Sequence, residues 1–479
     1  MTQVNDRSAF VHRFLDHVRK AMESYPRAGG SVALSQCPAV LDVMGGIGED
    51  SGSLVLTATL AMSFVAGVWL VSDDNVHVRM LTEAGHGPAR DFAIPLAAFQ
   101  PGDTAAALII ERCRQSDCDW AAPSCLAIRQ AITESVIPRP TKGLMILLQS
   151  DFPIDVDFGR PCVQAAASVD AVHKLSSCQV DRLRQSRACA TAVARLTGTS
   201  GVRIAMTALC APPGVSLLQL RFLSQTLCQP LELPNGIIVV GAHTRLTRPT
   251  SRDRLVETRA CTEMGRAMIV DLQRRDGLQV DENTHRLSAI TPSEYVERYR
   301  DRLPSKITGK AYREKFGELR GLDGQLNPDE IYKVRSRAEH HIYENKRVHE
   351  FAASIGRAKR NNSMQELANA GELMYASHWS HSQRCGIGGV EPDQLVSCIR
   401  KHGPTAGLFG AKVTAGGSGG ELVVLMRDND QARAALADAV VSAEAACNRK
   451  IHVWDGALPG AEHFHPPKFE ESLEAVGSV

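Results

Sequence analysis

Hydrophobic and polar positions change their period along the first eighty residues of the chain. Over residues 8–25 apolar side chains recur every three to four positions, which predicts an amphipathic helix. From residue 31 to about 78 β-branched residues become frequent, which predicts several strands. The longest apolar run, residues 56–71, contains polar residues and is shorter than the about 20 that cross a membrane as a helix. We interpret it as a buried strand pair or as one continued strand.

Strand and helix patterns alternate through the rest of the chain. Helices are predicted over residues 104–137, 162–173, 181–196, 201–218, 339–375, 393–402 and 430–447, and strands over residues 143–149, 231–242, 422–426 and 450–454. This mixed order predicts an α+β fold with two lobes, residues 1–225 and 226–479. A strongly charged stretch at about 275–345 indicates a helical insertion in the second lobe.

A glycine-rich segment precedes the strand predicted at residues 422–426. Five of the eleven residues from 410 to 420 are glycine, which lets another backbone or a phosphate approach closely. The alternative is a glycine-rich turn or bulge beside a hairpin. The candidate cofactor-binding residues of this segment are Gly416, Gly417, Ser418 and Gly419.

Composition excludes some classes of partner and suggests a compartment. Fifty-four basic and fifty-three acidic residues give a net charge of +1, so no overall field favours nucleic acid or an anionic membrane. The thirteen cysteines form no CxxC pair, and residues 1–10 lack a secretion signal. We therefore expect free thiols, a cytoplasmic location, and neither a nucleic-acid nor a membrane partner.

Several segments that lie far apart together resemble one enzyme family. They are Leu41–Ile47 with Ser51–Leu56, Tyr343–Val348, Gly371–Tyr375 with His378, and the glycine-rich segment 410–420. In this order they are similar to motifs of the GHMP superfamily of sugar kinases, above all L-arabinokinases and galactokinases, from about residue 30 to about 461.

The resemblance implies a two-lobed α+β fold, a function and cofactors. The first lobe is expected to be like ribosomal protein S5 domain 2 and the second ferredoxin-like, with a nucleotide and sugar cleft between them. In this family ATP, with Mg²⁺, phosphorylates a sugar, in galactokinases and L-arabinokinases at its anomeric hydroxyl. Fold alone does not establish function, so each site position needs its own test.

Two catalytic positions of the family carry apolar residues in this chain. Val40 stands where the family has an arginine before its first motif, and Ile204 stands where it has the catalytic aspartate. Valine cannot stabilise phosphoryl charge, and isoleucine cannot accept a proton. No catalytic residue is therefore assigned.

The second motif of the family normally holds the ATP phosphates with glycine amides and serine hydroxyls. Here its two glycines are replaced by Asp155 and Asp157, and its serines by Gly159, Arg160 and Pro161. A carboxylate beside a phosphate is repelled by about 1 to 4 kcal/mol, depending on the dielectric. As an alternative, Gly159 and Arg160 form a different anion pocket and are candidate cofactor-binding residues.

The sugar-contacting positions of the family are also changed. Glu49 and Asp50 follow the first motif and are candidate substrate-binding residues, with a solvated acidic turn as the alternative. The Asp-Tyr pair of the family becomes Arg254 and Leu255. The histidines near His378 match no tight ligand spacing, so no metal site is predicted and His378 is interpreted as a packed structural residue.

Three functional hypotheses remain open. The first is a pseudokinase that acts by binding a sugar, a sugar nucleotide or a protein partner. The second is an active ATP- and Mg²⁺-dependent sugar kinase with an altered substrate, in which Glu49 or Asp50 is the base and Arg160 or Arg203 supplies positive charge, although Arg203 is more simply a surface arginine. The third is an enzyme that uses a new polar cluster for different chemistry.

Overall fold

The computed structural model describes most of the chain and divides it into two compact units. The described residues are 7–81, 89–153, 155–179, 181–214, 216–222, 226–227, 230–246, 252–281, 285–319, 326–414 and 420–466. Unit 1 comprises Met1–Val40, Thr59–Gly214 and Trp454–Val479, and unit 2 comprises Leu41–Ala58 and Val215–Val453. The units therefore interleave in sequence, whereas the predicted lobes are consecutive, and the lobe boundary at 225 stays a prediction.

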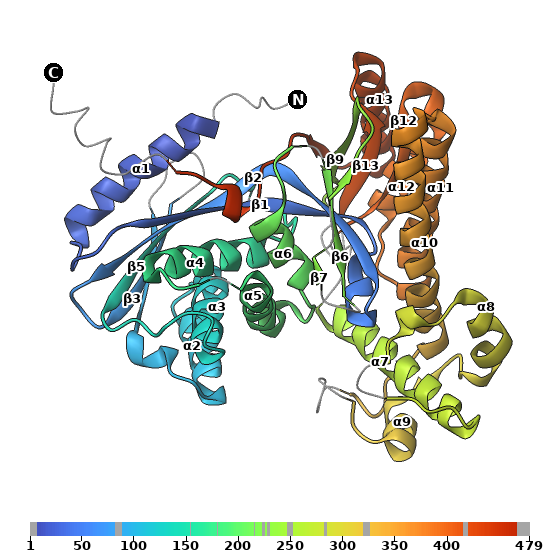
Figure 1. The fold of residues 1–479 in the computed structure, drawn as a ribbon, viewed down its shortest axis with the longest axis horizontal. Helices are drawn as coiled ribbons and strands as arrows, with labels where there is room; N and C mark the ends of the chain where they lie inside the picture. Colours follow the sequence, from blue (N-terminus) through green and yellow to red (C-terminus); the bar gives the residue numbers. More distant parts are fainter. Residues whose placement is uncertain are drawn as a thin grey trace. The chain divides into compact units, whose positions relative to one another are not determined.

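The sheet of unit 1 is built around one long strand (Figure 1). Its strands are β1 (Ala33–Met44), β2 (Leu54–Val71), β3 (Asn75–Met80), β4 (Arg90–Pro95) and β5 (Gly143–Ser150), in the order β4-β3-β5-β2 with β1 also beside β2. β5 runs parallel to β3 and antiparallel to β2. The apolar run at residues 56–71 thus belongs to one continued strand, the second of the two predicted alternatives.

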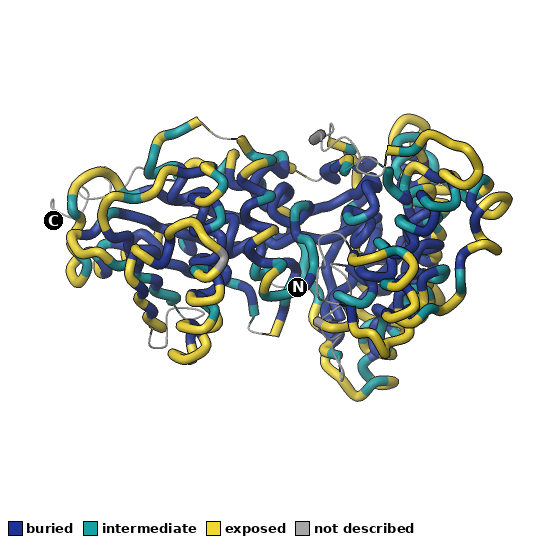
Figure 2. The backbone as a smooth tube through the Cα atoms, turned by 90° about the horizontal axis from the view of Figure 1, so that it is seen from below, coloured by how far each residue is buried: buried dark blue, intermediate teal, exposed yellow. Residues whose placement is uncertain are grey.

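Helices cover both faces of this sheet. α1 (Arg7–Ser24) lies on one face, where Phe14 and Val18 are fully buried beside Trp69 and Met145. The other face carries α2 (Asp103–Gln115), α3 (Ala122–Thr133), α4 (Arg160–Ser176), α5 (Arg182–Thr197) and α6 (Val202–Cys210), with the short turns η3 (Leu96–Phe99) and η4 (Asp119–Ala121). Buried residues run through the strands, and exposed residues gather on loops and outer helix faces (Figure 2).

The helix predicted over residues 201–218 is wrong in its second half. α6 ends at Cys210, and residues 216–221 form the strand β6 (Ser216–Arg221). Pro212 and Pro213 stand between the two elements, and proline has no N–H to continue a helix.

Unit 2 contains a four-stranded sheet with helices packed on it. The strand order is β12 (Leu408–Val413), β13 (Glu421–Arg427), β9 (Ile237–His243) and β14 (His452–Trp454), and β13 is antiparallel to β12 and β9. Its helices are α10 (Val334–Asn361), α11 (Met364–Ser380), α12 (Val390–His402) and α13 (Asp430–Cys447), with the turns η8 (His381–Cys385) and η9 (Pro404–Ala406). Leu54–Thr57 of β2 pair with β6, which also pairs with β7 (Thr226–Leu227) and β8 (Leu231–Glu232).

The predicted charged insertion has a core of its own. It consists of short elements beside the long helix α7 (Arg252–Arg275), namely η5 (Leu287–Ala289), α8 (Pro292–Glu294), η6 (Tyr295–Tyr299), η7 (Arg300–Arg302), β10 (Ile307–Thr308), α9 (Gly309–Phe316) and β11 (Ile331–Tyr332). Three tyrosines, Tyr295, Tyr299 and Tyr312, are almost completely buried in its core. Burial of these rings lets a charged sequence form a compact region.

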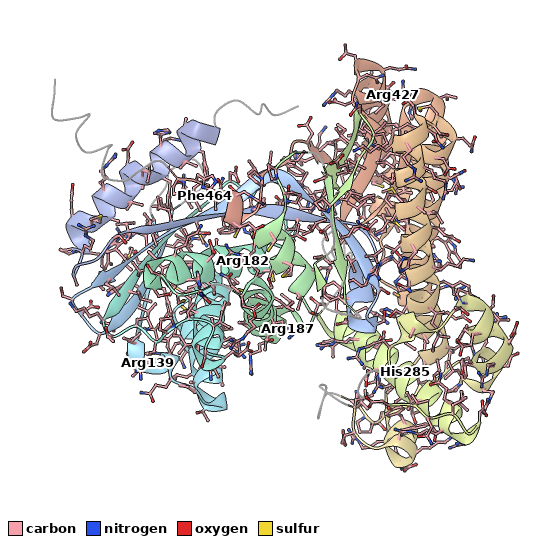
Figure 3. All side chains as sticks on the ribbon, in the orientation of Figure 1. Arg139, Arg182, Arg187, His285, Arg427 and Phe464 are labelled. Carbon is pink, nitrogen blue, oxygen red and sulfur yellow. The ribbon has the colours of Figure 1, made fainter. Side chains whose placement is uncertain are left out.

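The segment from Trp454 to Phe464 belongs to unit 1 and packs on its earlier residues. Thr59 Oγ1 donates to the Leu458 carbonyl at 2.6 Å, and the Gly460 N–H donates to the Ala211 carbonyl at 2.8 Å. The segment continues through η11 (Ala461–His463) to Phe464 (Figure 3). The ring of Phe464 lies 5.9 Å from Lys174 Nζ.

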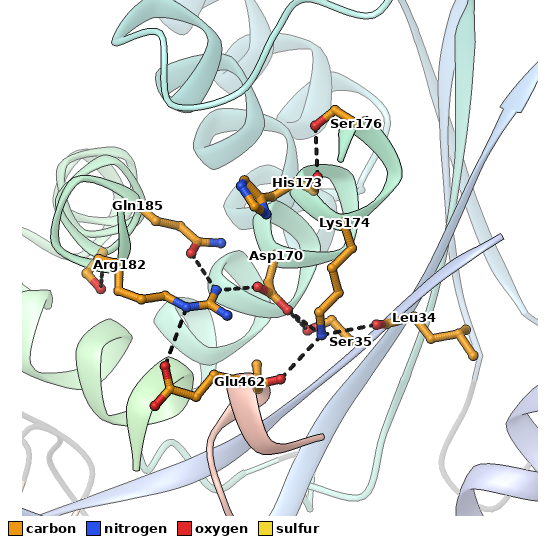
Figure 4. Close-up of polar contacts among 11 residues, drawn as sticks. Leu34, Ser35, Asp170, His173, Lys174, Ser176, Arg182, Gln185 and Glu462 are labelled. Carbon is orange, nitrogen blue, oxygen red and sulfur yellow. Dashed lines mark hydrogen bonds and ion pairs between the residues drawn. The ribbon is translucent and has the colours of Figure 1, made fainter. Parts of the chain in front are cut away.

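A buried aspartate connects this segment to α4 and α5 (Figure 4). Asp170 has no exposed surface and accepts from Ser35 at 2.7 Å, from Lys174 at 2.9 Å and from Arg182 at 2.5 Å. Arg182 also lies 3.7 Å from Glu462. Burial alone favours the neutral acid, but Lys174 and Arg182 outweigh it and lower the pKa of Asp170 below its usual value.

Two further observations concern the cysteines and the helices. Every cysteine that the structure describes is a free thiol. Within the described ranges, no helix is both long enough and apolar enough to cross a bilayer.

Candidate functional site

In the loop before α4, backbone N–H groups at the amino terminus of the helix donate hydrogen bonds to other groups of the chain. The Arg160 N–H donates to Asp157, at 2.6 Å to its carbonyl and at 3.0 Å to Oδ1. The next residue, Pro161, has no N–H, and Cys162 and Val163 both donate to the Gly159 carbonyl at 2.9 Å. A helix amino terminus attracts anions through such donors, and here a carboxylate of the chain already binds one of them. Together with the negative charge of Asp157, these contacts do not fit the phosphate chain of ATP.

Ile204 packs directly against Gly159 of this loop. Gly159 has a φ of 80°, and a Cβ built on it would lie 2.6 Å from Ile204 Cγ2. Ile204 itself is only 9% exposed, on the first turn of α6. The Cys162 thiol adds a contact from α4 to the Gly201 carbonyl at 3.3 Å. Ile204 is therefore an apolar contact of this loop.

Both arginines predicted as sources of positive charge contact backbone carbonyls. Arg160 Nη1 donates to the Pro153 carbonyl at 3.0 Å. Arg203 Nη1 donates to the Ser200 carbonyl at 3.1 Å, and its side chain is only 3% exposed. The interpretation of Arg203 as a surface arginine is wrong, because the side chain lies inside unit 1. An anion pocket of Gly159 and Arg160 stays a prediction.

Two further contacts, one from β1 and one from Trp454, hold the loop before α4 in place. The Val40 N–H, on β1, donates to the Phe158 carbonyl at 3.0 Å. Phe158 has a φ of 36°, which is rare for a residue other than glycine, and its buried ring meets Trp454 edge to face at 5.8 Å. Surrounding contacts thus maintain an unfavourable backbone conformation.

The candidate substrate residues of unit 2 lie on the 3-10 turn η1 (Gly46–Ser51). Glu49 is 7% exposed, and Asp50 lies 3.8 Å from Arg259 of α7. Nearby, Leu255 packs with Ile47, Cys385 and Ile387 in a small apolar cluster. The other candidates, Gly416, Gly417, Ser418 and Gly419, lie outside the described residues.

Unit 2 contains a buried charged cluster that the sequence analysis did not identify. Glu344 of α10 has no exposed surface and contacts Ser377 at 2.5 Å, Arg347 at 2.8 Å and the Gly45 N–H at 3.4 Å. Lys412 of β12 is equally buried. Burial favours the neutral acid, yet Arg347, His381 and Lys412 lower the pKa of Glu344 to about 2. Glu344 is therefore a buried carboxylate at neutral pH.

Three buried histidines surround this cluster. His340 and His381 have ring centroids 4.5 Å apart, and His341 lies 2.8 Å from Thr262 and 3.1 Å from Ser51. Burial, followed by the charge of Lys412, lowers the pKa of His381 to about 3, and burial lowers the pKa of His341 to about 4. In the part of the chain that the structure describes, no three His, Cys, Asp or Glu side chains are placed to hold a metal ion.

We expect stability to fall as the pH decreases below about 6.5. In the unfolded chain these histidines bind protons near pH 6.5, whereas His341 and His381 stay neutral in the folded protein down to about pH 4 and 3. The unfolded state then binds more protons, so acidification costs about 1.4 kcal/mol per pH unit for each histidine. Glu344 adds a loss between its usual pKa of 4.5 and about 2.

Urea unfolding at pH 7.0, 6.0 and 5.0 measures this dependence. The His341→Gln variant, which keeps a polar side chain but cannot be protonated, is expected to show a shallower decrease than the unmodified chain. Equal stability at pH 7.0 and 5.0 would contradict the assignment of buried neutral histidines.

Comparison with solved structures identifies the fold. Galactokinase of Lactococcus lactis, solved with galactose, superposes with a TM-score of 0.68 over 94% of this chain and 99% of its own, at 16% identity. The fold is that of the GHMP kinases. Mevalonate kinase of Methanococcus jannaschii shares this GHMP fold, with a TM-score of 0.52 over 90% of this chain and 98% of its own, at 12% identity.

The sequence comparison agrees with the GHMP fold and with the predicted resemblance. L-arabinokinase of Arabidopsis thaliana is 24% identical over 513 residues, covering 93% of this chain. The chain spans 48% of the length of that relative. No family model matches the chain. The α+β GHMP fold and the likeness to galactokinase and L-arabinokinase are thus confirmed, whereas the roles of the individual site residues remain predictions.

Proposed function

We propose that this GHMP sugar kinase-like chain acts by binding and does not transfer phosphate from ATP. The observation that carries the proposal is the closed loop before α4, where Asp157 accepts the Arg160 N–H and Ile204 packs on Gly159. Phosphoryl transfer depends on positioned donors and positive charge, and loss of one such group typically reduces the rate about 100- to 1,000-fold. Because several of these groups are replaced together, we expect no useful phosphoryl transfer, and binding is the role that remains.

The ligand is proposed from the relatives. Galactokinase binds galactose and L-arabinokinase is named for arabinose, so a sugar or a sugar nucleotide is the first candidate, and a protein partner is the second. The proposal includes a cytoplasmic location, which the free thiols of the described cysteines support.

The purified protein is expected to show no rise in melting temperature with millimolar Mg-ATP. A ligand at one hundred times its Kd stabilises a folded protein by about 2.7 kcal/mol, so productive ATP binding would be visible in a thermal-unfolding assay. The same samples, incubated with labelled ATP and either galactose or arabinose, are expected to yield no sugar phosphate.

An active kinase with an altered substrate would give the opposite result. ATP-dependent sugar phosphorylation that disappears in Arg160→Ala or Asp50→Asn would refute the proposal and support that alternative. Glu350→Ala is the matched control, since Glu350 is an exposed residue of α10 whose side chain pairs only loosely, at 3.6 Å, with Lys346. The third hypothesis, different chemistry in a new polar cluster, stays a prediction.

A further inference from the structure

A pocket of unit 2 has features that the proposed function does not use. It lies among α11, η8 and α12 and has a volume of about 290 Å³. That volume lies at the lower end of the range of about 300 to 1,000 Å³ usual for ligand pockets, so the pocket suits one small ring-shaped ligand. All of its lining residues fall between positions 375 and 400, within one unit.

The pocket has an exposed tryptophan on its wall. Trp379 is 56% exposed, whereas Trp69 is completely buried and the other two tryptophans of the chain are half-buried. The guanidinium of Arg384 lies 5.7 Å from the centre of the indole, which favours one orientation of the ring. An exposed indole presents a flat apolar surface with little conformational freedom, which suits it for stacking.

A fixed carboxylate lies in the same pocket. Asp393 Oδ1 accepts from Ser382 at 3.1 Å and from His378 Nε2 at 3.0 Å. His378 Nδ1 accepts the N–H of Val413 at 3.3 Å, so the ring proton must be on Nε2. Both donors contact the same oxygen, which orients the carboxylate and leaves Oδ2 to accept from a ligand.

The charges in the pocket favour a neutral ligand. Arg400 pairs with Glu372 at 2.7 Å and lies 4.8 Å over the ring of Tyr375, so its guanidinium already contacts a carboxylate and an aromatic ring. Asp393 would repel an anionic ligand. Gln383 and Ser397 also line the pocket and add amide and hydroxyl groups that both donate and accept.

The local backbone keeps these groups in place. Ser382 and Gln383 belong to η8, a π-helical turn, and such turns are frequent at functional sites. Gly388 packs so closely on Ser382 that a Cβ at this glycine would lie 2.8 Å from the Ser382 Cβ. The pocket is thus preformed, which reduces the entropy lost on binding.

We propose that this pocket binds one neutral sugar ring. The C–H face of the ring stacks on Trp379, its hydroxyls donate to Asp393 Oδ2, and the amide of Gln383 completes the contacts. The site is independent of the loop before α4, so it neither requires nor excludes phosphoryl transfer.

Titration of the full chain with galactose, arabinose, glucose and lactose tests the proposal. The emission of Trp379 is expected to shift to shorter wavelength with a saturable response at millimolar sugar, and calorimetry gives the Kd of each variant. The three monosaccharides represent a free sugar and lactose represents the end of a glycan, so the stronger binder identifies the source.

Matched variants separate stacking from general effects on folding. Trp379→Ala is expected to weaken binding at least tenfold, Trp379→Phe to retain most of it, and Asp393→Asn to weaken it about tenfold through loss of the charged acceptor. Val441→Ala, at another exposed apolar position of unit 2, is expected to bind like the unmodified chain.

Three results would overturn the proposal. The first is the absence of a saturable response up to about 100 mM sugar, which is one hundred times a Kd of about 1 mM. The second is that Trp379→Ala binds sugar as tightly as the unmodified chain. The third is that a sugar phosphate binds more tightly than the neutral sugar. Sugar binding that persists in Trp379→Ala would place the ligand elsewhere and leave the proposed binding function intact.

Discussion

Replacement of Glu344 by alanine is expected to destabilise unit 2 by about 3 to 5 kcal/mol. The variant leaves Arg347 without its carboxylate partner at 2.8 Å and removes the negative charge near Lys412, which has no exposed surface. A buried charge that loses its compensation costs far more than an exposed one. Ser377 and the Gly45 N–H lose an acceptor as well.

Thermal and urea unfolding of purified variants measure this loss. For a unit of this size, 3 kcal/mol corresponds to a decrease in melting temperature of about 6 °C. Glu344→Gln keeps a hydrogen-bond acceptor without the charge, and its stability is expected to lie between that of the unmodified chain and that of Glu344→Ala. Glu350→Ala, at an exposed position of the same helix, is the control and is expected to change stability by less than about 0.5 kcal/mol. If Glu344→Ala and Glu350→Ala were equally stable, the cluster would have no structural role.

Replacement of Gly371 by alanine is expected to cost about 3 kcal/mol or more. Gly371 lies on α11 where the helix crosses β12, and a Cβ at this position would overlap the carbonyl oxygen of Phe409. A backbone carbonyl cannot move away as a side-chain end can, so the helix and the strand would have to separate. The hydrophobic core between them would then lose contact.

Gly356→Ala provides a control of the same chemistry. Gly356 lies within α10, and an added Cβ would meet only the end of the Arg360 side chain, at 3.4 Å. Alanine favours the helix over glycine by up to about 1 kcal/mol, so this variant is expected to be slightly more stable. Opposite shifts in melting temperature for the two variants would support the helix–strand contact, and equal shifts would contradict it.

The spacing of apolar residues over a short stretch was enough to predict several helices and strands. The apolar positions of residues 8–25 indicated α1, and the apolar stretch at 143–149 indicated β5. The helix predicted over residues 201–218 runs through Pro212 and Pro213, whose missing N–H groups favour a break. The end of α6 could therefore be predicted from the sequence.

Other features depend on distant residues and could not be predicted from one sequence. The cluster at Glu344 combines Gly45, just before η1, with α10, α11 and β12, and nothing local indicates that a glutamate of α10 is buried. The burial of Arg203 likewise depends on the packing of α6 in unit 1. By contrast, the resemblance to the family's motifs was enough to single out Asp157 and Ile204 as candidate positions, and the roles inferred for them stay predictions. Their contacts at Gly159 required the structure.

The segment from Trp454 to Phe464 follows unit 2 in the sequence but packs on unit 1, and this order affects how the chain folds during synthesis. A ribosome releases this segment only after all of unit 2, yet Trp454 packs on Phe158 and Glu462 approaches Arg182 within unit 1. Unit 1 is therefore completed only after residues 454–464 have been synthesised, later than unit 2. Until then a nascent chain holds an incomplete unit 1, with the Phe158 loop lacking one of its supports, and a chaperone that binds nascent chains would meet it in that form.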